Sequence, residues 1–118
     1  MHRIMLASKI HRAVAQEVNL HYEGSITIDE EILNAADLLP YQQVQVYNLS
    51  TGARFETYAI AGEAGSGKIV VNGAAARLVH RGDLLIIAAY GLIEEARAAE
   101  HKPKIVHLDE QNRIAATL

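Results

Sequence analysis

The chain has 118 residues, enough for one hydrophobic core and too few for two ordinary domains, so we expect a single domain spanning 1–118. Its net charge of -3 and the absence of any Lys/Arg cluster argue against nucleic-acid binding, and the absence of Cys excludes disulfides, thiolate metal sites and thiol nucleophiles. No apolar segment reaches membrane-spanning length, and polar residues interrupt the first segment, so we expect a cytoplasmic protein with no membrane contact.

The first half of the chain predicts strands and one short helix. Segment 1–20 fits neither the helix nor the strand period cleanly, and we favour strands there. Asp29 can cap a helix over 30–36, because acids follow it at the positive end of the dipole and Pro40 marks a stop.

The second half predicts several short strands and a second helix. Segments 44–49 and 55–60 flank the turn Ser50-Thr51-Gly52 and are typical of a hairpin. Further strands are expected at 69–71, at 84–90, which is apolar enough to be buried on both faces, and at 105–108. A second helix is expected over 92–100, before Pro103. Many short strands separated by turns favour a closed barrel or a sandwich.

Gly24 and Ser25 lie together directly before an alternating segment that begins at Ile26. Such a pair is most often an ordinary turn. Glycine has no Cβ, however, so its carbonyl can be approached closely and its backbone can be held in a strained conformation that favours attack by the next hydroxyl. Attack of this kind would move the acyl chain from nitrogen to oxygen.

A second group of polar residues lies on segment 54–58. Strand alternation places Arg54, Glu56 and Tyr58 on one face and Phe55 and Thr57 on the other. An exposed strand face explains such a pattern in most proteins, yet a guanidinium and a phenol would share this surface.

Other polar residues carry weaker signals. The turn from Asn72 to Ala76 has small side chains, so its backbone N–H groups could approach a carboxylate, although such a turn usually only precedes a helix. Lys9 and His11 would share one face of an extended strand. The histidines show no metal-ligand spacing, and we expect no metal site.

Taken together, these motifs resemble the bacterial aspartate 1-decarboxylases, which are pyruvoyl enzymes of pantothenate biosynthesis. The similarity covers nearly the whole chain and runs through Met5-Leu6, Lys9-Ile10-His11-Arg12, Leu20 to Ser25, Ile28-Asp29, Gly52, Arg54-Phe55, Thr57 to Ile60, Val71 to Ala76 and Gly82-Asp83. The resemblance implies a mainly β fold, a double-psi β-barrel with a few short helices. It also implies a homotetramer whose active sites lie between subunits.

The resemblance further implies a self-processing zymogen. The Ser25 hydroxyl would attack the Gly24 carbonyl, and elimination and hydrolysis would leave a β chain of residues 1–24 and an α chain of 25–118 that starts with a pyruvoyl cofactor. In such lyases the cofactor forms a Schiff base with L-aspartate and accepts electrons as CO2 leaves, which gives β-alanine. Tyr58 would then be the proton donor.

The same resemblance assigns the remaining site residues. Those expected at the substrate are Lys9, Arg54, Thr57, Asn72, Gly73, Ala74 and Ala75. Those expected in processing are Gly24, Ser25, Thr57, His11 and Tyr22, with a possible maturation factor as a further partner. Which cation would hold which substrate carboxylate is left open.

Two other hypotheses belong to different classes. The chain could be a processing-dead barrel that binds a small acid or a protein partner, but such a module has no need for Gly24, Ser25, Thr57 and Tyr58 together. A nucleic-acid-binding regulator is disfavoured by the acidic balance. Tyr47, where many relatives carry Trp, departs from the family pattern without removing a motif residue.

Overall fold

Strands dominate the computed structural model, which describes residues 1–118. The strands are β1 (His2–Val14), β2 (Glu17–Asn19), β3 (Ile26–Asp29), β4 (Gln43–Asn48), β5 (Arg54–Gly62), β6 (Ile69–Asn72), β7 (Leu84–Glu94), β8 (Lys104–Leu108) and β9 (Ile114–Thr117). The helices are short: α1 (Glu30–Ala35), the 3-10 helix η1 (Gly73–Leu78) and α2 (Glu95–Ala98). The predicted fold class, mainly β with a few short helices, is confirmed.

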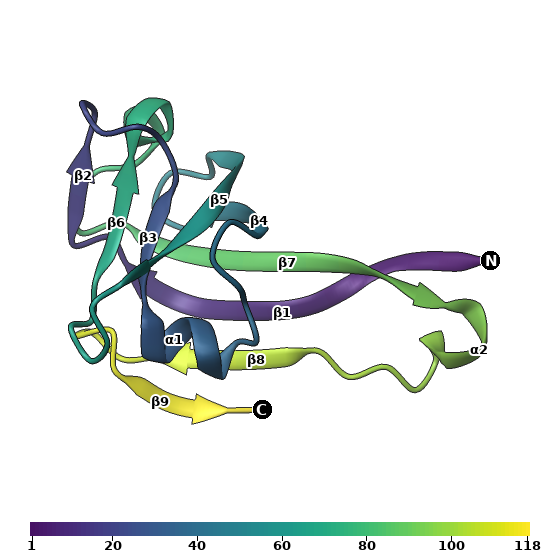
Figure 1. Cartoon of the computed structure of the whole chain (residues 1–118). Helices are drawn as coiled ribbons and strands as arrows, with labels where there is room; N and C mark the ends of the chain where they lie inside the picture. Colours follow the sequence, from purple (N-terminus) through teal and green to yellow (C-terminus); the bar gives the residue numbers. More distant parts are fainter.

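The nine strands form one hydrogen-bonded array in the order β2-β6-β3-β5-β4-β7-β1-β8-β9. Three neighbouring pairs are parallel, namely β1 with β8, β2 with β6, and β3 with β5. This mixed order, with connections that cross between distant strands, is compatible with the predicted double-psi barrel. The ends of β1 and β7 continue beyond the barrel as a long two-stranded ribbon that carries the N-terminus (Figure 1).

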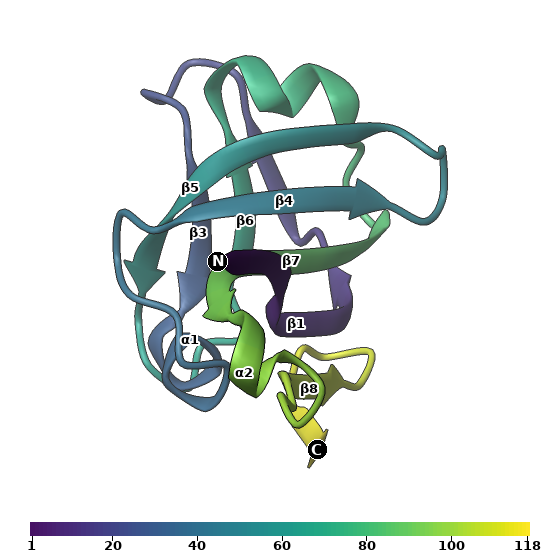
Figure 2. The same ribbon diagram turned by 90° about the vertical axis from the view of Figure 1, so that its right-hand side faces the viewer.

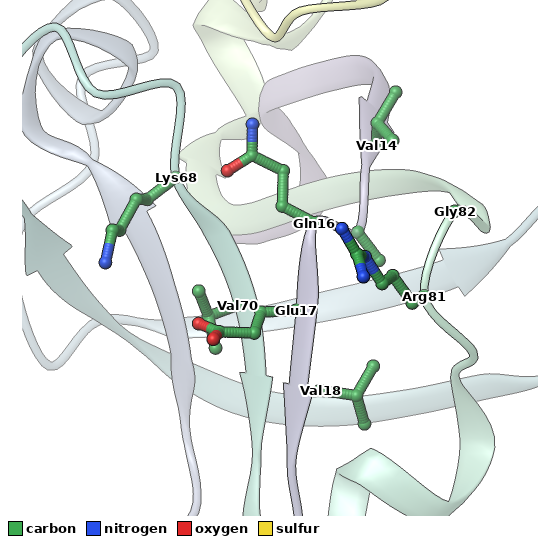
Figure 3. A pocket seen from close by; sticks show the side chains of 9 residues that line it. Val14, Gln16, Glu17, Val18, Lys68, Val70, Arg81 and Gly82 are labelled. Carbon is green, nitrogen blue, oxygen red and sulfur yellow. The ribbon is translucent and has the colours of Figure 1, made fainter.

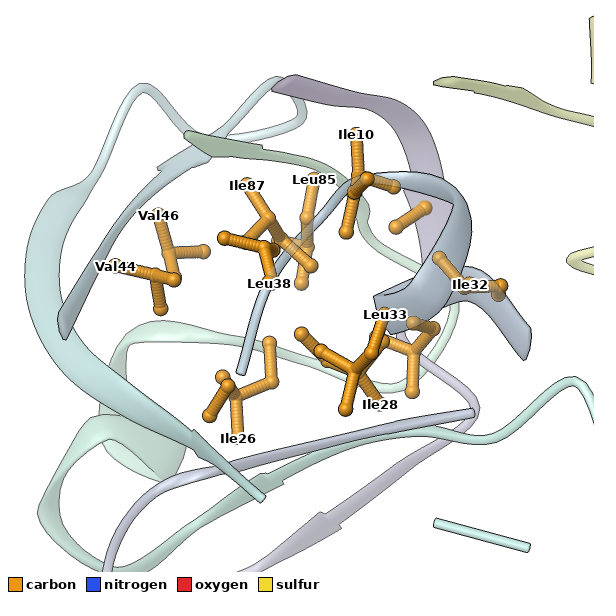
Figure 4. Packing of buried hydrophobic residues seen from close by; sticks show 14 of the residues in the cluster. Ile10, Ile26, Ile28, Ile32, Leu33, Leu38, Val44, Val46, Leu85 and Ile87 are labelled. Atoms are coloured by element: carbon orange, nitrogen blue, oxygen red, sulfur yellow. The ribbon is translucent and has the colours of Figure 1, made fainter. Parts of the chain in front are cut away.

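A single apolar core fills the space that the strands enclose (Figure 4). It consists almost entirely of Ile, Val, Leu and Ala, and its fully buried members include Ile10, Ile26, Val46, Leu85 and Ile87. On β4 the burial alternates, as a strand with one face on the core requires. Each fully buried Ile, Leu or Val side chain contributes about 1.5–3 kcal/mol, so this interior is the main source of stability.

Asp29 joins the start of α1 to the loop before β6. Its Oδ1 accepts from Glu31 N at 2.8 Å, which is the predicted helix cap, and from Gly65 N at 3.0 Å. Its Oδ2 accepts from Gly67 N at 2.8 Å. The carboxylate is buried, and these three N–H donors compensate for its removal from water.

The two ends of the barrel differ. In Figures 1 and 2, α1 lies at one end, while η1 and the loop between β2 and β3 lie at the other. That loop carries Gly24 and Ser25, and η1 begins at Gly73, so topology gathers several predicted site residues at one end.

One predicted element is wrong. Instead of a helix over 92–100, β7 continues to Glu94, and α2 occupies only Glu95–Ala98. The reason is non-local, because the start of β1 pairs with the end of β7 from His2↔Glu94 onward. The predicted strands in 1–20, the 44–60 hairpin and the 84–90 strand are confirmed. No helix is both long and apolar enough to cross a membrane.

Candidate active site

The Gly24–Ser25 junction has an unusual backbone, and its serine is buried. Both residues have left-handed backbones, with φ of 76° at Gly24 and 80° at Ser25. For a serine this conformation costs of order 1–3 kcal/mol, so the surrounding structure must impose it. Gly24 N donates to Tyr22 O at 2.8 Å, which tightens the turn, and Ser25 is only 3% exposed.

Asn72 holds the segment that follows this junction. Its backbone N donates to Ser25 O at 3.0 Å, and its side-chain Nδ2 lies 3.4 Å from Ser25 Oγ and 3.1 Å from Thr27 Oγ1. The Ser25 hydroxyl therefore faces a neutral amide donor. Asn72, predicted only as a substrate-binding residue, is a direct partner of Ser25.

Gly73 packs directly on Gly24. A Cβ at position 73 would lie 2.5 Å from both Gly24 Cα and Gly24 N, and Gly73 itself has a left-handed φ of 66°. Only glycine satisfies both constraints. Ala74 and Ala75 follow Gly73 within η1, so the turn predicted to bind substrate begins directly against Gly24.

Tyr58 reaches the junction from the neighbouring strand. β5 pairs in parallel with β3, with Ala59 opposite Ile26. The phenol Oη donates to Glu23 O at 3.4 Å, and the side chain is exposed to 40%. The Tyr58 phenol thus lies beside the start of β3, next to the segment that carries the buried Ser25.

A cavity of about 400 Å³ opens between these groups. It is lined by Tyr22, Glu23, Ser25, Pro40, Tyr41, Tyr58, Ile60 and Ala61. Tyr22 was predicted near the processing loop and lines this cavity. Sequence reasoning missed Tyr41, because the turn that brings it here has no recognisable motif, and it missed Ile60 as part of the wall.

Arg54 does not reach this cavity within one chain. It lies four residues before Tyr58 on β5, which corresponds to roughly 13 Å along a strand. Its guanidinium instead lies 3.9 Å above the Tyr47 ring, a cation–π contact, and Tyr47 Oη forms a 2.8 Å hydrogen bond with Tyr90 Oη. Burial and the Tyr90 hydrogen bond raise the pKa of Tyr47, against the opposing effect of Arg54.

Lys9 and His11 also do not line the cavity. Both lie on β1, where Lys9 pairs with Ala88 of β7 and Ile105 of β8. The His11 ring stands edge-on to His107 with centroids 5.1 Å apart, and its buried Nδ1 has no hydrogen-bond partner. Burial, followed by the charge of Lys9 and the His107 ring, lowers the pKa of His11.

Thr57 lies on the opposite face of β5 from Tyr58 and makes no side-chain hydrogen bond to the junction. One chain therefore brings together Ser25, Tyr58 and the turn at Asn72, while Lys9, Arg54 and His11 lie elsewhere. No group of three or more His, Cys, Asp or Glu side chains could hold a metal ion.

The largest cavity lies away from this junction. It measures about 710 Å³ and borders β2, β6 and the loop before β7 (Figure 3). Its lining is Val14, Ala15, Gln16, Glu17, Val18, Lys68, Val70, Arg81 and Gly82. None of the predicted site residues lines it.

Residues 1–115 match the family described as aspartate decarboxylase. The chain is 62% identical over 113 residues to an aspartate 1-decarboxylase of Syntrophobacter fumaroxidans, covering 96% of this chain and 91% of the relative. It is 56% identical over 116 residues to that of Heliobacterium modesticaldum (98% and 88% covered) and 52% identical over 113 residues to that of Thermoanaerobacter pseudethanolicus (96% and 97% covered). Among solved structures, the computationally designed protein msDPBB_sym2 is similar with a TM-score of 0.45 and 20% identity, covering 72% of this chain and 96% of the design.

Proposed function

The chain belongs to the aspartate decarboxylase family, and we propose that it converts L-aspartate into β-alanine and CO2 with a pyruvoyl group made from its own Ser25. It is a decarboxylase, and the pathway that the family serves is pantothenate biosynthesis. The observation that carries the cofactor proposal is the strained backbone of Ser25, which follows Gly24, is buried and lines one cavity with Tyr58.

Cleavage begins with attack of Ser25 Oγ on the Gly24 carbonyl carbon, which breaks the C–N bond and leaves an ester. Elimination then releases Gly24 as a carboxylate. Hydrolysis by one water puts a ketone oxygen in place of the former serine nitrogen, which departs as ammonia. Backbone strain at Ser25 destabilises the uncut chain and so favours cleavage. The Asn72 amide nitrogen Nδ2 lies close enough to Ser25 Oγ to orient this hydroxyl. Thr57 is proposed, from the family pattern, to stabilise the charge on the attacked carbonyl oxygen.

The residues at this position fit a pyruvoyl group. Its ketone supplies an electron sink for the bond that breaks when CO2 leaves. The buried position of Ser25 limits water at the reacting carbon, and the cavity leaves space on the side of Tyr58. Tyr58 delivers the proton to the carbon that has lost CO2, a role supported by its phenol, which lines the cavity with Ser25 and donates to Glu23 O, one residue before Gly24.

Substrate binding is proposed to require a second subunit. The cavity of one chain is lined by no Lys or Arg, yet aspartate carries two carboxylates that need charged partners. Lys9 and Arg54 fulfil this need if a neighbouring subunit presents them to the Ser25 cavity. We therefore propose a homotetramer with shared active sites, supported also by the ribbon of β1 and β7, where Ile4 is 75% and Leu92 69% exposed.

The remaining parts of the proposal follow the family resemblance. The Asn72–Ala75 turn contacts substrate once cleavage has opened the cavity, and His11 and Tyr22 act near the processing step. The enzyme is proposed to work in the cytoplasm, with or without a maturation factor that accelerates cleavage.

Intact mass spectrometry under denaturing conditions tests the proposal. We expect two chains, residues 1–24 and residues 25–118 with a pyruvoyl group in place of Ser25, and β-alanine formation from aspartate. Ser25→Ala should give one uncut, inactive chain. The chain offers a matched control, because Gly65-Ser66 is a second Gly-Ser pair whose glycine also has a left-handed φ of 78°. Ser66→Ala should be cut normally.

A single uncut mass in the wild-type protein, unchanged after prolonged warming, would favour the alternative of a barrel that binds a small acid or a protein partner. Adding lysate of a cell that naturally makes this protein distinguishes a missing maturation factor from a chain that never forms the pyruvoyl group. Cleavage that appears only with lysate indicates a maturation factor, whereas none at all removes the pyruvoyl mechanism.

A further inference from the structure

We propose that Tyr41 is a positioning residue that holds the Tyr58 ring in the orientation from which it delivers a proton to one face of the reacting carbon. The inference rests on the proposed function, because it concerns the proton donor of that reaction. It adds a residue that the sequence motifs did not include.

The backbone fixes Tyr41 beside Tyr58. Tyr41 N donates to Ala59 O at 2.6 Å, and Ala59 N donates back to Gln42 O at 3.0 Å, so the turn after α1 is clamped to the residue that follows Tyr58. Leu39 N also donates to Gln42 Oε1 at 3.0 Å, which closes the turn.

This clamp holds Tyr41 in an unfavourable conformation. Its φ is 73°, a left-handed value that is uncommon for a bulky aromatic residue. An Asn or Gly would adopt this turn more readily. A tyrosine kept in such a turn points to a role for its side chain.

The side chain makes one aromatic contact. The Tyr41 and Tyr58 rings have centroids 6.4 Å apart and planes tilted by 31°, and both rings line the cavity that contains Ser25. This separation lies within the range of attractive aromatic pairs. Tyr58 is thus restrained twice, at its ring by Tyr41 and at its hydroxyl by Glu23 O.

Cleavage affects these two restraints differently. Cutting after Gly24 places Glu23 in the 1–24 chain, one residue from its new C-terminus and no longer covalently joined to Tyr58. Tyr41 and Tyr58 stay together in the 25–118 chain, and the clamp at Ala59 joins them. In the mature enzyme, Tyr41 is therefore the restraint that stays covalently tied to the proton donor.

A restrained donor has a stereochemical consequence. When CO2 leaves, the carbon that carried it takes one proton from Tyr58, which recovers a proton from solvent. In D2O this carbon receives one deuterium, and a fixed Tyr58 places it on one face only. A ring released from Tyr41 delivers deuterium to both faces.

Three variants separate the ring from the turn. Tyr41→Phe keeps the ring, Tyr41→Asn suits the left-handed turn without a ring, and Tyr41→Leu keeps bulk without aromatic character. Mass spectrometry of each variant measures cleavage, and kcat, KM and the configuration of deuterated β-alanine are measured on the cleaved fraction.

We expect Tyr41→Phe to match wild type. For Tyr41→Asn and Tyr41→Leu, kcat should fall about tenfold, a part of the roughly 10²- to 10⁴-fold that a positioned general acid contributes, with KM within about twofold and deuterium on both faces. Wild-type kcat and a single deuterium configuration in Tyr41→Asn would overturn the proposal, since they would show that only the turn is needed.

A readout independent of turnover uses 3-fluorotyrosine incorporated into the full-length protein, with the five tyrosine signals assigned by single Tyr→Phe variants. The ¹⁹F signal of Tyr58 should move and sharpen in Tyr41→Asn and Tyr41→Leu. An unchanged Tyr58 signal in both would also overturn the inference. Failure of the wild type to cleave even with lysate would instead refute the proposed function, while this signal still reports on the ring contact.

Discussion

Gly73 lies against Gly24 so closely that a Cβ on Gly73 would stand 2.5 Å from Gly24 Cα. The two residues come from η1 and the β2–β3 loop, so this contact packs that loop against the turn that follows β6. Backbone atoms cannot move aside as the end of a flexible side chain can, so a larger residue at position 73 must displace Gly24 or the turn itself.

Gly73→Ala is therefore expected to slow self-cleavage by at least about tenfold, because a shift of about 1 Å in a reacting pair can cost 10²-fold. The measurement is the rate at which the 1–24 and 25–118 chains appear by mass spectrometry. Gly52→Ala is the matched control, since Gly52 has a φ of 83° but nothing within 4 Å of its Cβ position. Equal cleavage rates in the two variants would show that the Gly24 contact is irrelevant.

Asn72→Ala should also slow cleavage without unfolding the barrel. The change removes the amide that lies 3.4 Å from Ser25 Oγ, while the backbone bond from Asn72 N to Ser25 O remains available. Thr27→Val provides the comparison, because it removes only the other contact of the same amide, at Thr27 Oγ1. We expect the alanine variant to be cut several times more slowly than the valine variant, and the reverse order would contradict the assigned role.

Much of this arrangement could be predicted from the sequence. Strand alternation placed Tyr58 on the exposed face of β5, and turn chemistry singled out Gly24, Ser25 and the turn at Asn72. Strand alternation and turn chemistry both depend on residues that are close together in the sequence. The family resemblance, rather than composition or periodicity, supplied the name of the activity.

The features that local sequence patterns could not predict depend on contacts between residues far apart in the chain. The expected helix over 92–100 was wrong because strand β1, from the other end of the chain, pairs with the end of β7. Tyr41 lies beside Tyr58 because backbone hydrogen bonds join its turn to Ala59, and no sequence motif predicts these bonds. Arg54 belongs to a sequence motif, yet it does not line the Ser25 cavity of its own chain, and its proposed role would require another subunit.

Mixed assemblies test whether the active site is shared. Ser25→Ala lacks the cofactor precursor, and Arg54→Ala lacks the guanidinium proposed to bind substrate, so each homotetramer should be nearly inactive. Co-expression or refolding of the two together should restore a fraction of wild-type activity, on the order of a quarter for random mixing of two chains at one interface. Separately assembled tetramers mixed without exchange serve as control. No recovery in verified mixed assemblies would show that Ser25 and Arg54 act within one chain.

The His11 environment predicts a loss of stability in mild acid. Burial, Lys9, His107 and Arg12 lower the pKa of His11 below its unfolded value of about 6.5, so the folded chain binds this proton less readily than the unfolded chain. The group's contribution to stability is complete above the unfolded pKa and is lost as the pH falls from there through the lowered folded pKa. Ile86 of β7, which lies opposite His11, adds no charge.

Urea unfolding between pH 8 and pH 5 measures this contribution in the uncut Ser25→Ala chain, at one protein concentration so that subunit association stays constant. His11→Leu fills the same site without a titrating group and should show a smaller decrease in unfolding free energy over this range. His2→Gln, which removes an exposed histidine at the end of the ribbon, should follow the parent chain. If His11→Leu lost as much stability as the parent, another group would cause the acid sensitivity, and the unpartnered Nδ1 of His11 would have no part in it.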